Sequence, residues 1–320
     1  MRKARCPHDA ADRARYTNPM IRFAILALAA VAVPATAQNP ASATPKLLTW
    51  PDLTKRPKPT PDATVDYGAD AMQKIDVWIP QGKGPFPVVL MVHGGCWTTS
   101  IADRSLMNWI ADDLRKDGVA VWNIDYRGVD LAGGGYPGTF ADAGSAADRL
   151  AVDARRFNLD TRHLVAVGHS AGGHLALWLA ARRKLPATSA LHTKHPLRIR
   201  HVISLGGLPD LDATAADATN GCGTEVVAKL VGAATPQHPD IYADTSVPRL
   251  LPLGAKQDLV NGREDRIIPF HMATDYVAKA EAAGDRAMLH IVPATGHVEL
   301  IAPDTAAWAE TKRLITTALK

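Results

Sequence analysis

Residues 163–173 read HLVAVGHSAGG, a short apolar run that passes directly into a glycine-rich turn. The run HLVAV is typical of a strand, and the Ala- and Leu-rich residues 172–183 that follow are typical of a helix. The turn between them has the pattern G-x-S-x-G, in which a sharp strand-to-helix bend lifts the serine hydroxyl out of the sheet. Gly168 and Gly172 flank this serine because a Cβ in so tight a bend would collide with neighbouring backbone. Ser170 is therefore the candidate nucleophile, and capping of the helix is its alternative role.

The rest of the chain repeats this alternation of strand-like and helix-like segments. Strand-like patterns lie at 74–79, 87–92, 119–124, 201–205, 258–260 and 288–292. Helix-like patterns lie between and after them, at 105–116, 140–157, 272–283 and 304–319. Such alternation over more than 200 residues predicts one α/β domain, residues 65–320, with a mostly parallel sheet covered by helices on both faces. In such sheets the chemistry collects in the loops at the carboxyl ends of the strands.

A second glycine-rich motif follows the apolar strand-like run 87–92, which continues into HGGCW at 93–97. A loop of this kind lets backbone N–H groups approach a ligand oxygen closely. Hydrolases built on a G-x-S-x-G turn combine such amides with the amide of the residue after the nucleophile. The predicted oxyanion hole therefore consists of the amides of Gly95, Cys96 and Ala171, and a tight turn without catalytic role is the alternative. The remaining members of the motif are expected to support this loop: His93, Gly94 and Trp97.

Taken together, HGGCW and GHSAGG resemble the α/β-hydrolase fold, and more narrowly its carboxylesterase and arylformamidase branch, whose loop reads HGG-x-W. The resemblance extends from about Asp66 onward. It includes DYGADAMQKIDVWIP at 66–80, DYRG at 125–128 and the final Gly-His at 296–297. It implies a catalytic triad in the chain order serine, acid, histidine.

His297 is the predicted catalytic histidine because, of twelve histidines, it is the one that directly follows the last strand. Its ring would take the proton of the nucleophile and return it to the leaving group. Asp265, in GREDRIIP at 262–269, resembles the turn that carries the acid in this fold, and it would hold the imidazole in the correct tautomer. Asp258 is the alternative acid and Asp210 a more distant one, and a surface salt bridge is an alternative role for all three.

The front of the chain, residues 1–37, has the features of a leader and a secretory signal peptide. The apolar stretch 23–33 is shorter than the about 20 residues that a membrane-spanning helix needs. It is followed by an A-x-A cleavage site that ends at Ala37. Residues 1–19 contain two acidic side chains and make a poor signal start, so translation is predicted to begin at Met20. Cleavage predicts export to the periplasm or the medium, and a buried N-terminal helix is the alternative.

Residues 38–64 contain six prolines and no hydrophobic period, which predicts an extended arm outside the core. The basic excess of the chain is confined to the leader, since residues 38–320 carry 30 basic and 30 acidic side chains. This balance of charges argues against a nucleic-acid or anionic-membrane partner. Stable insertion into a membrane is not expected either.

Cys96 and Cys222 remain in the exported chain, and the sequence leaves open whether they form a disulfide. Neither C-x-x-C nor H-E-x-x-H occurs, so no metal site and no cofactor are expected. The segment 208–247, with loop-like stretches around a helix at 224–230, is the predicted small cap, which leaves a fairly open cleft.

These motifs predict a serine hydrolase that cleaves small-molecule carboxylic esters through an acyl-enzyme intermediate. An arylformamidase and a non-catalytic binding protein of the same fold are the alternatives. The sequence does not define acyl or alcohol specificity or oligomeric state.

Overall fold

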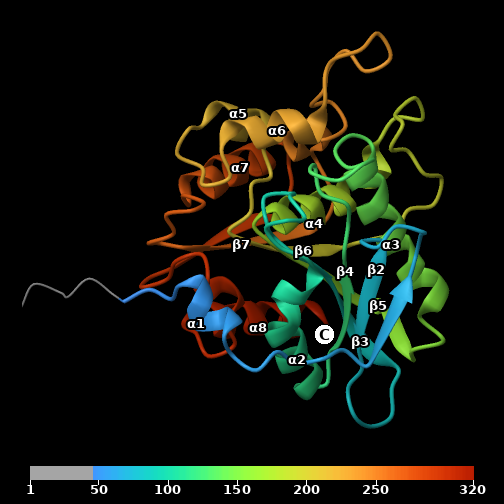
Figure 1. Ribbon diagram of the computed structural model, residues 1–320, viewed down its shortest axis with the longest axis vertical. Coiled ribbons are helices and arrows are strands. Elements are labelled where there is room, and N and C mark those ends of the chain that lie inside the picture. The colour runs from blue at the N-terminus through green and yellow to red at the C-terminus, as the bar shows by residue number, and fades with distance from the viewer. Residues whose placement is uncertain (1–45) are drawn as a thin grey trace, which may run out of the picture. The chain divides into compact units, whose positions relative to one another are not determined.

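A single sheet of eight strands forms the centre of the part that the computed structural model describes, residues 46–320 (Figure 1). The strand order is β1-β2-β4-β3-β5-β6-β7-β8. The strands are β1 Ala63–Asp66, β2 Lys74–Trp78, β3 Phe86–Val92, β4 Ala120–Ile124, β5 Leu159–His169, β6 His201–Leu205, β7 Lys256–Gly262 and β8 Ala287–Val292. The pairs β1–β2 and β2–β4 are antiparallel and all other neighbours are parallel, which confirms the predicted mostly parallel sheet.

Helices cover both faces of this sheet (Figure 1). One face carries α1 Trp50–Thr54, α2 Asn108–Lys116 and α8 Ala306–Ala318. The other face carries α3 Gly138–Asp153, α4 Ala171–Ala181, α5 Leu211–Ala216, α6 Thr224–Val231 and α7 His271–Ala282. Strands, crossovers and helices in this arrangement form an α/β-hydrolase fold, as expected.

The two layers of the core follow from the alternation of side chains along each central strand. In β3, Val89 and Met91 join the hydrophobic cluster under α2 and α8, whereas Val88, Leu90 and Val92 join the cluster under α3 and α4. All five are fully buried. A strand that is apolar on both sides is buried on both sides, which explains why its sequence is a continuous apolar run.

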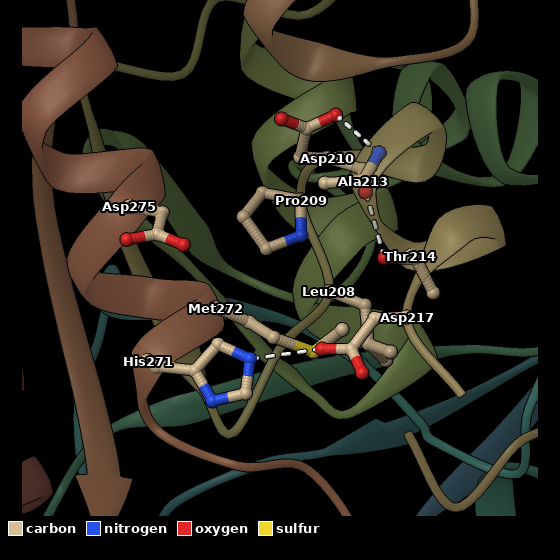
Figure 2. Close-up of a pocket in the computed structure, with 9 residues that line it drawn as sticks. All are labelled: Leu208, Pro209, Asp210, Ala213, Thr214, Asp217, His271, Met272 and Asp275. Carbon is tan, nitrogen blue, oxygen red and sulfur yellow. Dashed lines mark hydrogen bonds and ion pairs between the residues drawn. The ribbon is translucent and has the colours of Figure 1, made fainter. Parts of the chain in front are cut away.

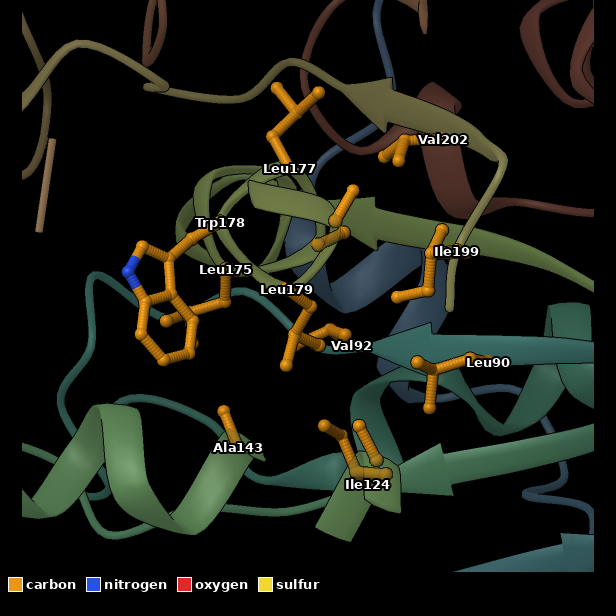
Figure 3. Close-up of a cluster of buried hydrophobic side chains, with 14 of the residues drawn as sticks. Leu90, Val92, Ile124, Ala143, Leu175, Leu177, Trp178, Leu179, Ile199 and Val202 are labelled. Atoms are coloured by element: carbon orange, nitrogen blue, oxygen red, sulfur yellow. The ribbon is translucent and has the colours of Figure 1, made fainter. Parts of the chain in front are cut away.

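Helix α4 lies in the middle of one layer, and all eleven of its residues are buried. Figure 3 shows its Leu175, Trp178 and Leu179 among side chains of β3 and α3. A helix that is enclosed on every side has no need of a polar face, and the run Ala171–Ala181 accordingly has none. The helix that follows Ser170 is thus held rigidly against the sheet.

The prediction of an arm outside the core was wrong for residues 50–54. They form α1, and its Leu53 is fully buried against α2 and α8. The prolines after α1 are also fixed, because Trp109 Nε1 donates to the carbonyl of Pro57 and Asn108 Nδ2 to that of Pro59. Proline breaks regular structure without preventing burial, so the absence of a hydrophobic period did not exclude a core contribution.

The segment 208–247 contains one more helix than predicted, since α5 lies within the expected loop before α6. Asp210 caps α5 by accepting from the amide of Ala213. The predicted signal peptide, its cleavage after Ala37 and the start at Met20 fall outside the described residues. Within residues 46–320, no helix is both long and apolar enough to cross a membrane.

Burial of α1 leads to a stability prediction. Leu53→Ala is expected to lower the free energy of unfolding by about 2–5 kcal/mol, because it removes a fully buried side chain and leaves a cavity. Met288→Ala is the matched control, since Met288 is 54% exposed, and it is expected to cost less than about 0.5 kcal/mol. Urea unfolding followed by circular dichroism measures both variants. Equal midpoints for them would show that residues 46–54 do not belong to the folded core.

Candidate active site

The turn between β5 and α4 places Ser170 at the carboxyl end of the central strand. Its backbone has φ 55° and ψ −123°, which is uncommon for a residue with a side chain. The neighbouring glycines are required because backbone carbonyl groups approach them too closely for a side chain to fit. A Cβ at Gly168 would lie 2.0 Å from the carbonyl oxygen of Gly172, and one at Gly172 would lie 2.2 Å from that of Val92. The sequence therefore has to supply glycine on both sides of the serine.

His297 and Asp265 form the second part of the site. Nδ1 of His297 and Oδ2 of Asp265 are 2.7 Å apart, and both side chains are buried. The other carboxylate oxygen of Asp265 accepts from the amides of Ile267 and Ile268 at 2.8 and 2.9 Å. Because the carboxylate is held on both oxygens, the imidazole has a fixed orientation.

Ser170 and His297 line one cavity of about 350 Å³. No hydrogen bond joins the two side chains within residues 46–320, and Nε2 of His297 has no hydrogen-bond partner there. Hydrogen bonds between catalytic groups are often long in the free enzyme and tighten when substrate binds. The arrangement leaves one imidazole nitrogen unpaired on a histidine that lines the same cavity as the serine.

The alternative acids lie elsewhere. Asp258 accepts from Nε2 of His201 at 2.6 Å and from Nε2 of His290 at 2.8 Å. Burial raises the pKa of Asp258, but the hydrogen bonds from these two histidines outweigh burial and hold the pKa below its ordinary value. Asp210 caps α5 and forms an ion pair with Lys279. The structure thus brings Asp265, and neither of the alternatives, to His297.

The predicted oxyanion loop lies against the nucleophile turn. A Cβ at Gly94 would lie 3.0 Å from the Cβ of Ser170, so only a glycine lets the loop approach this closely. No acceptor in the described part of the chain takes a hydrogen bond from the backbone N–H of Gly95, Cys96 or Ala171. These three amides are therefore available to a ligand oxygen near the serine.

Two side chains of the motif brace this loop from below. His93 stacks on Tyr126 with ring centroids 4.3 Å apart, and its Nε2 lies 2.9 Å from Oδ1 of Asp125. Trp97 donates from Nε1 to Nδ1 of His174 at 3.3 Å. Burial lowers the pKa of His174 to about 4, so its ring is neutral and can accept this hydrogen bond. His93 and Trp97 are thus both buried with polar partners, and their role in supporting the loop stays a prediction.

His169, the residue before the nucleophile, contacts the ring of His297 with centroids 4.4 Å apart. Its Nε2 lies 3.2 Å from the carbonyl oxygen of His297 and donates to it. Burial first, and then the neighbouring imidazole, hold the pKa of His169 well below its ordinary value. A neutral ring at this position adds no positive charge beside His297.

Two residues of the site were missed by the sequence analysis. Trp50 of α1 lines the cavity, and its ring lies edge-on to that of His297 with centroids 6.2 Å apart. Glu299 is buried and accepts from the amide of Gly296 at 3.0 Å and from the amide of Leu48. It therefore ties the segment before α1 to the loop that carries His297. The sequence did contain a local signal for α1, because Thr49 and Asp52 form the capping pattern of a helix start.

Cys96 is bonded to Cys222, which answers the question that the sequence left open. The bond joins the oxyanion loop to the segment between α5 and α6, 126 residues later. Within residues 46–320, no group of three or more His, Cys, Asp or Glu side chains is arranged so that it could hold a metal ion.

A second, much smaller cavity of about 40 Å³ lies between α5 and α7 (Figure 2). Most of its polar side chains are already paired, since His271 Nε2 lies 2.8 Å from Oδ2 of Asp217 and Asp210 caps α5. It has room for about one or two water molecules. Neither Ser170 nor His297 reaches it, so we do not assign it to the site.

Comparison with known proteins identifies the family. The family model described as BD-FAE matches residues 75–279, well over half of the chain. The chain belongs to the BD-FAE family of α/β-hydrolase esterases.

Individual proteins that are similar to this chain are also named as esterases. An esterase of Gibberella moniliformis is 27% identical over 121 residues, 37% of either protein. The versiconal hemiacetal acetate esterase of Dothistroma septosporum is 33% identical over 105 residues, 32% of this chain and 30% of that protein. The chain thus spans about a third of the length of these curated relatives. A truncated carbohydrate esterase from gut microbiota has a TM-score of 0.68 at 20% identity, over 81% of this chain and 97% of that one, which supports the fold.

The position of Trp50 predicts a kinetic effect. Trp50→Ala is expected to lower kcat/KM for ester hydrolysis about tenfold, mainly through KM, because the substrate loses an aromatic wall worth roughly 1.4 kcal/mol. Trp50→Phe retains part of that wall and is expected to lose less. Initial rates over a range of ester concentrations give both constants. An unchanged kcat/KM in Trp50→Ala would contradict a role for α1 in substrate binding.

Proposed function

We propose that this chain is an exported carboxylesterase that hydrolyses small carboxylic esters through an acyl-enzyme on Ser170. His297 acts as general base and then general acid, and Asp265 orients it. The observation that carries the proposal is the hydrogen bond of 2.7 Å between His297 Nδ1 and Asp265 in a cavity that Ser170 also lines. With Nδ1 donating to the carboxylate, Nε2 is the nitrogen that can accept the serine proton.

In the first step, the hydroxyl of Ser170 attacks the ester carbonyl while His297 takes its proton. The carbonyl oxygen becomes an anion, which needs donors at a fixed place. The unpaired amides of Gly95, Cys96 and Ala171 support this role. Ala171 is also the first residue of α4, so the positive end of the helix dipole faces the developing charge.

In the following steps, the protonated His297 gives its proton to the leaving alcohol, and the acyl group stays on Ser170. Water then attacks the acyl-enzyme with His297 again acting as base, which releases the acid and restores the serine. Asp265 stabilises the imidazolium at each of these stages, and its own two amide contacts hold its carboxylate in place.

The cavity supports a small acyl group or a phenolic ring as its occupant. Its volume of about 350 Å³ is at the lower end of ligand sites. Apolar side chains form much of the wall: Trp50, Ile101, Leu106 and Ile267. Short-chain and plant phenolic esters therefore fit the site better than long acyl chains.

Export is supported by two independent features. The first is the signal-peptide pattern that ends at Ala37. The second is the Cys96–Cys222 disulfide, since such bonds persist in oxidising compartments and are rare in the cytosol. An extracellular or periplasmic location also favours ester substrates over N-formylkynurenine, the arylformamidase substrate, which is handled inside cells.

Matched variants test the proposal. Ser170→Ala is expected to lower kcat about 10⁶-fold, because the nucleophile is removed. Asp265→Asn is expected to lower kcat by roughly 10³- to 10⁴-fold, because the imidazole loses its orienting carboxylate. Asp258→Asn is the control acid and is expected to stay within about threefold of the wild type, since it contacts His201 and His290 instead. The assay uses p-nitrophenyl acetate and butyrate, methyl ferulate and N-formylkynurenine.

The outcomes separate the alternatives. Full turnover by Ser170→Ala would overturn the proposed mechanism, and equal losses in the two aspartate variants would overturn the role of Asp265. Faster turnover of N-formylkynurenine than of any ester would favour an arylformamidase. A folded wild-type protein that turns over none of the four compounds and does not react with a fluorophosphonate would favour a binding protein.

A further inference from the structure

The oxyanion loop has an uncommon backbone. Gly95, Cys96 and Trp97 have φ values of 106°, 51° and 52°, so three consecutive residues lie in the left-handed half of conformational space. Only the first of them is a glycine. Residues with side chains keep such a conformation when surrounding contacts hold them there. The loop therefore depends on its anchors for the direction of its amides.

One anchor is covalent and comes from the segment between α5 and α6. The disulfide fixes Cys96 to Cys222, with the two Cα atoms 5.4 Å apart. Cys222 is itself held, since its amide donates to Oδ1 of Asn220 at 3.1 Å. The side-chain amide of Asn220 is buried and donates to the carbonyls of Thr214 and Asp217 at the end of α5. The position of Cys96 is thus tied to the base of the cap.

The same segment also touches the turn that carries the acid. The amide of Gly221 donates to the carbonyl of Ile267 at 2.6 Å. A Cβ at Gly221 would lie 2.9 Å from Cγ2 of Ile267, so the contact needs glycine. The amide of Ile267 in turn donates to Asp265, which binds His297. The disulfide therefore links the oxyanion loop to the Asp265 turn through two adjacent residues, Gly221 and Cys222.

We propose that Cys222 is a positioning residue for ester hydrolysis, and that its disulfide holds the amide of Cys96 in the direction that the transition state requires. This proposal rests on the proposed function. The oxyanion exists only in the transition state and the tetrahedral intermediate, so a misdirected amide lowers kcat and leaves substrate binding nearly unchanged. Activity consequently depends on the redox state of the bond.

The bond is open to chemical reduction. Both cysteines are partly exposed, and both also line a cavity of about 350 Å³ that Ser170 does not line, beside Val129 and Val226. A dithiol such as dithiothreitol attacks one sulfur through its thiolate. It transfers two electrons and two protons in all, which leaves two protein thiols and converts the dithiol to its own cyclic disulfide.

The experiment compares the full mature protein in three forms: oxidised wild type, wild type reduced by dithiothreitol after folding, and Cys222→Ser. We expect kcat for p-nitrophenyl acetate to fall by about ten- to a hundredfold in the reduced wild type and in Cys222→Ser, with KM within about twofold. Re-oxidation restores the wild type. Cys222→Ser does not respond to dithiothreitol, which controls for effects of the reductant elsewhere.

A purely structural bond gives a different result. It would lower the melting temperature of the reduced protein while kcat, measured well below that temperature, stays at the oxidised value, and this outcome would overturn the proposal. A rise in KM alone, with kcat unchanged, would overturn the proposal as well. The proposed function itself would fail if the oxidised wild type showed no ester turnover that depends on Ser170. That result is distinct from a failure of the role of Cys222.

Discussion

The site depends on the backbone reversal at Ser170, where the chain leaves β5 and enters α4. The sheet itself fixes this turn, because the amide of Ser170 donates to the carbonyl of Leu205 at the end of β6, 2.8 Å away. Close packing then excludes side chains around it. A Cβ at Gly173 would lie 2.5 Å from Oγ of Ser204. A Cβ at Gly168 or Gly172, on either side of the serine, would clash with backbone atoms. A buried helix and a twisted parallel sheet thus determine where one hydroxyl can be.

Around that hydroxyl, fixed groups replace mobile solvent. Asp265 has both carboxylate oxygens occupied, and His169 is kept neutral by burial while it donates to the backbone of His297. Two of the three amides proposed for the oxyanion hole, those of Gly95 and Cys96, belong to the loop that also contains His93 and Trp97. Donors and charges that are already in place need no reorganisation during the reaction, which is the main source of electrostatic catalysis.

The candidates Ser170 and His297 come from local signals in the sequence: a motif in a strand–turn–helix context and a position after the last strand. The choice between Asp265 and Asp258 needed the register of β7, which pairs Asp258 with residues of β6 and β8 and so directs its carboxylate to His201 and His290. The contribution of Trp50 depends on a contact between segments about 250 residues apart, and the disulfide on one of 126 residues. The hydrophobic periodicity of a sequence does not predict contacts between such distant segments.

In the proposed mechanism His297 activates Ser170 as a nucleophile, and covalent labelling tests this role most directly. The wild type and His297→Ala are treated with a fluorophosphonate, digested and mapped by mass spectrometry. We expect one adduct, on the peptide that contains Ser170, with a labelling rate at least about a hundredfold lower in the variant. An adduct on another residue, or equal labelling of Ser170 in both proteins, would contradict it.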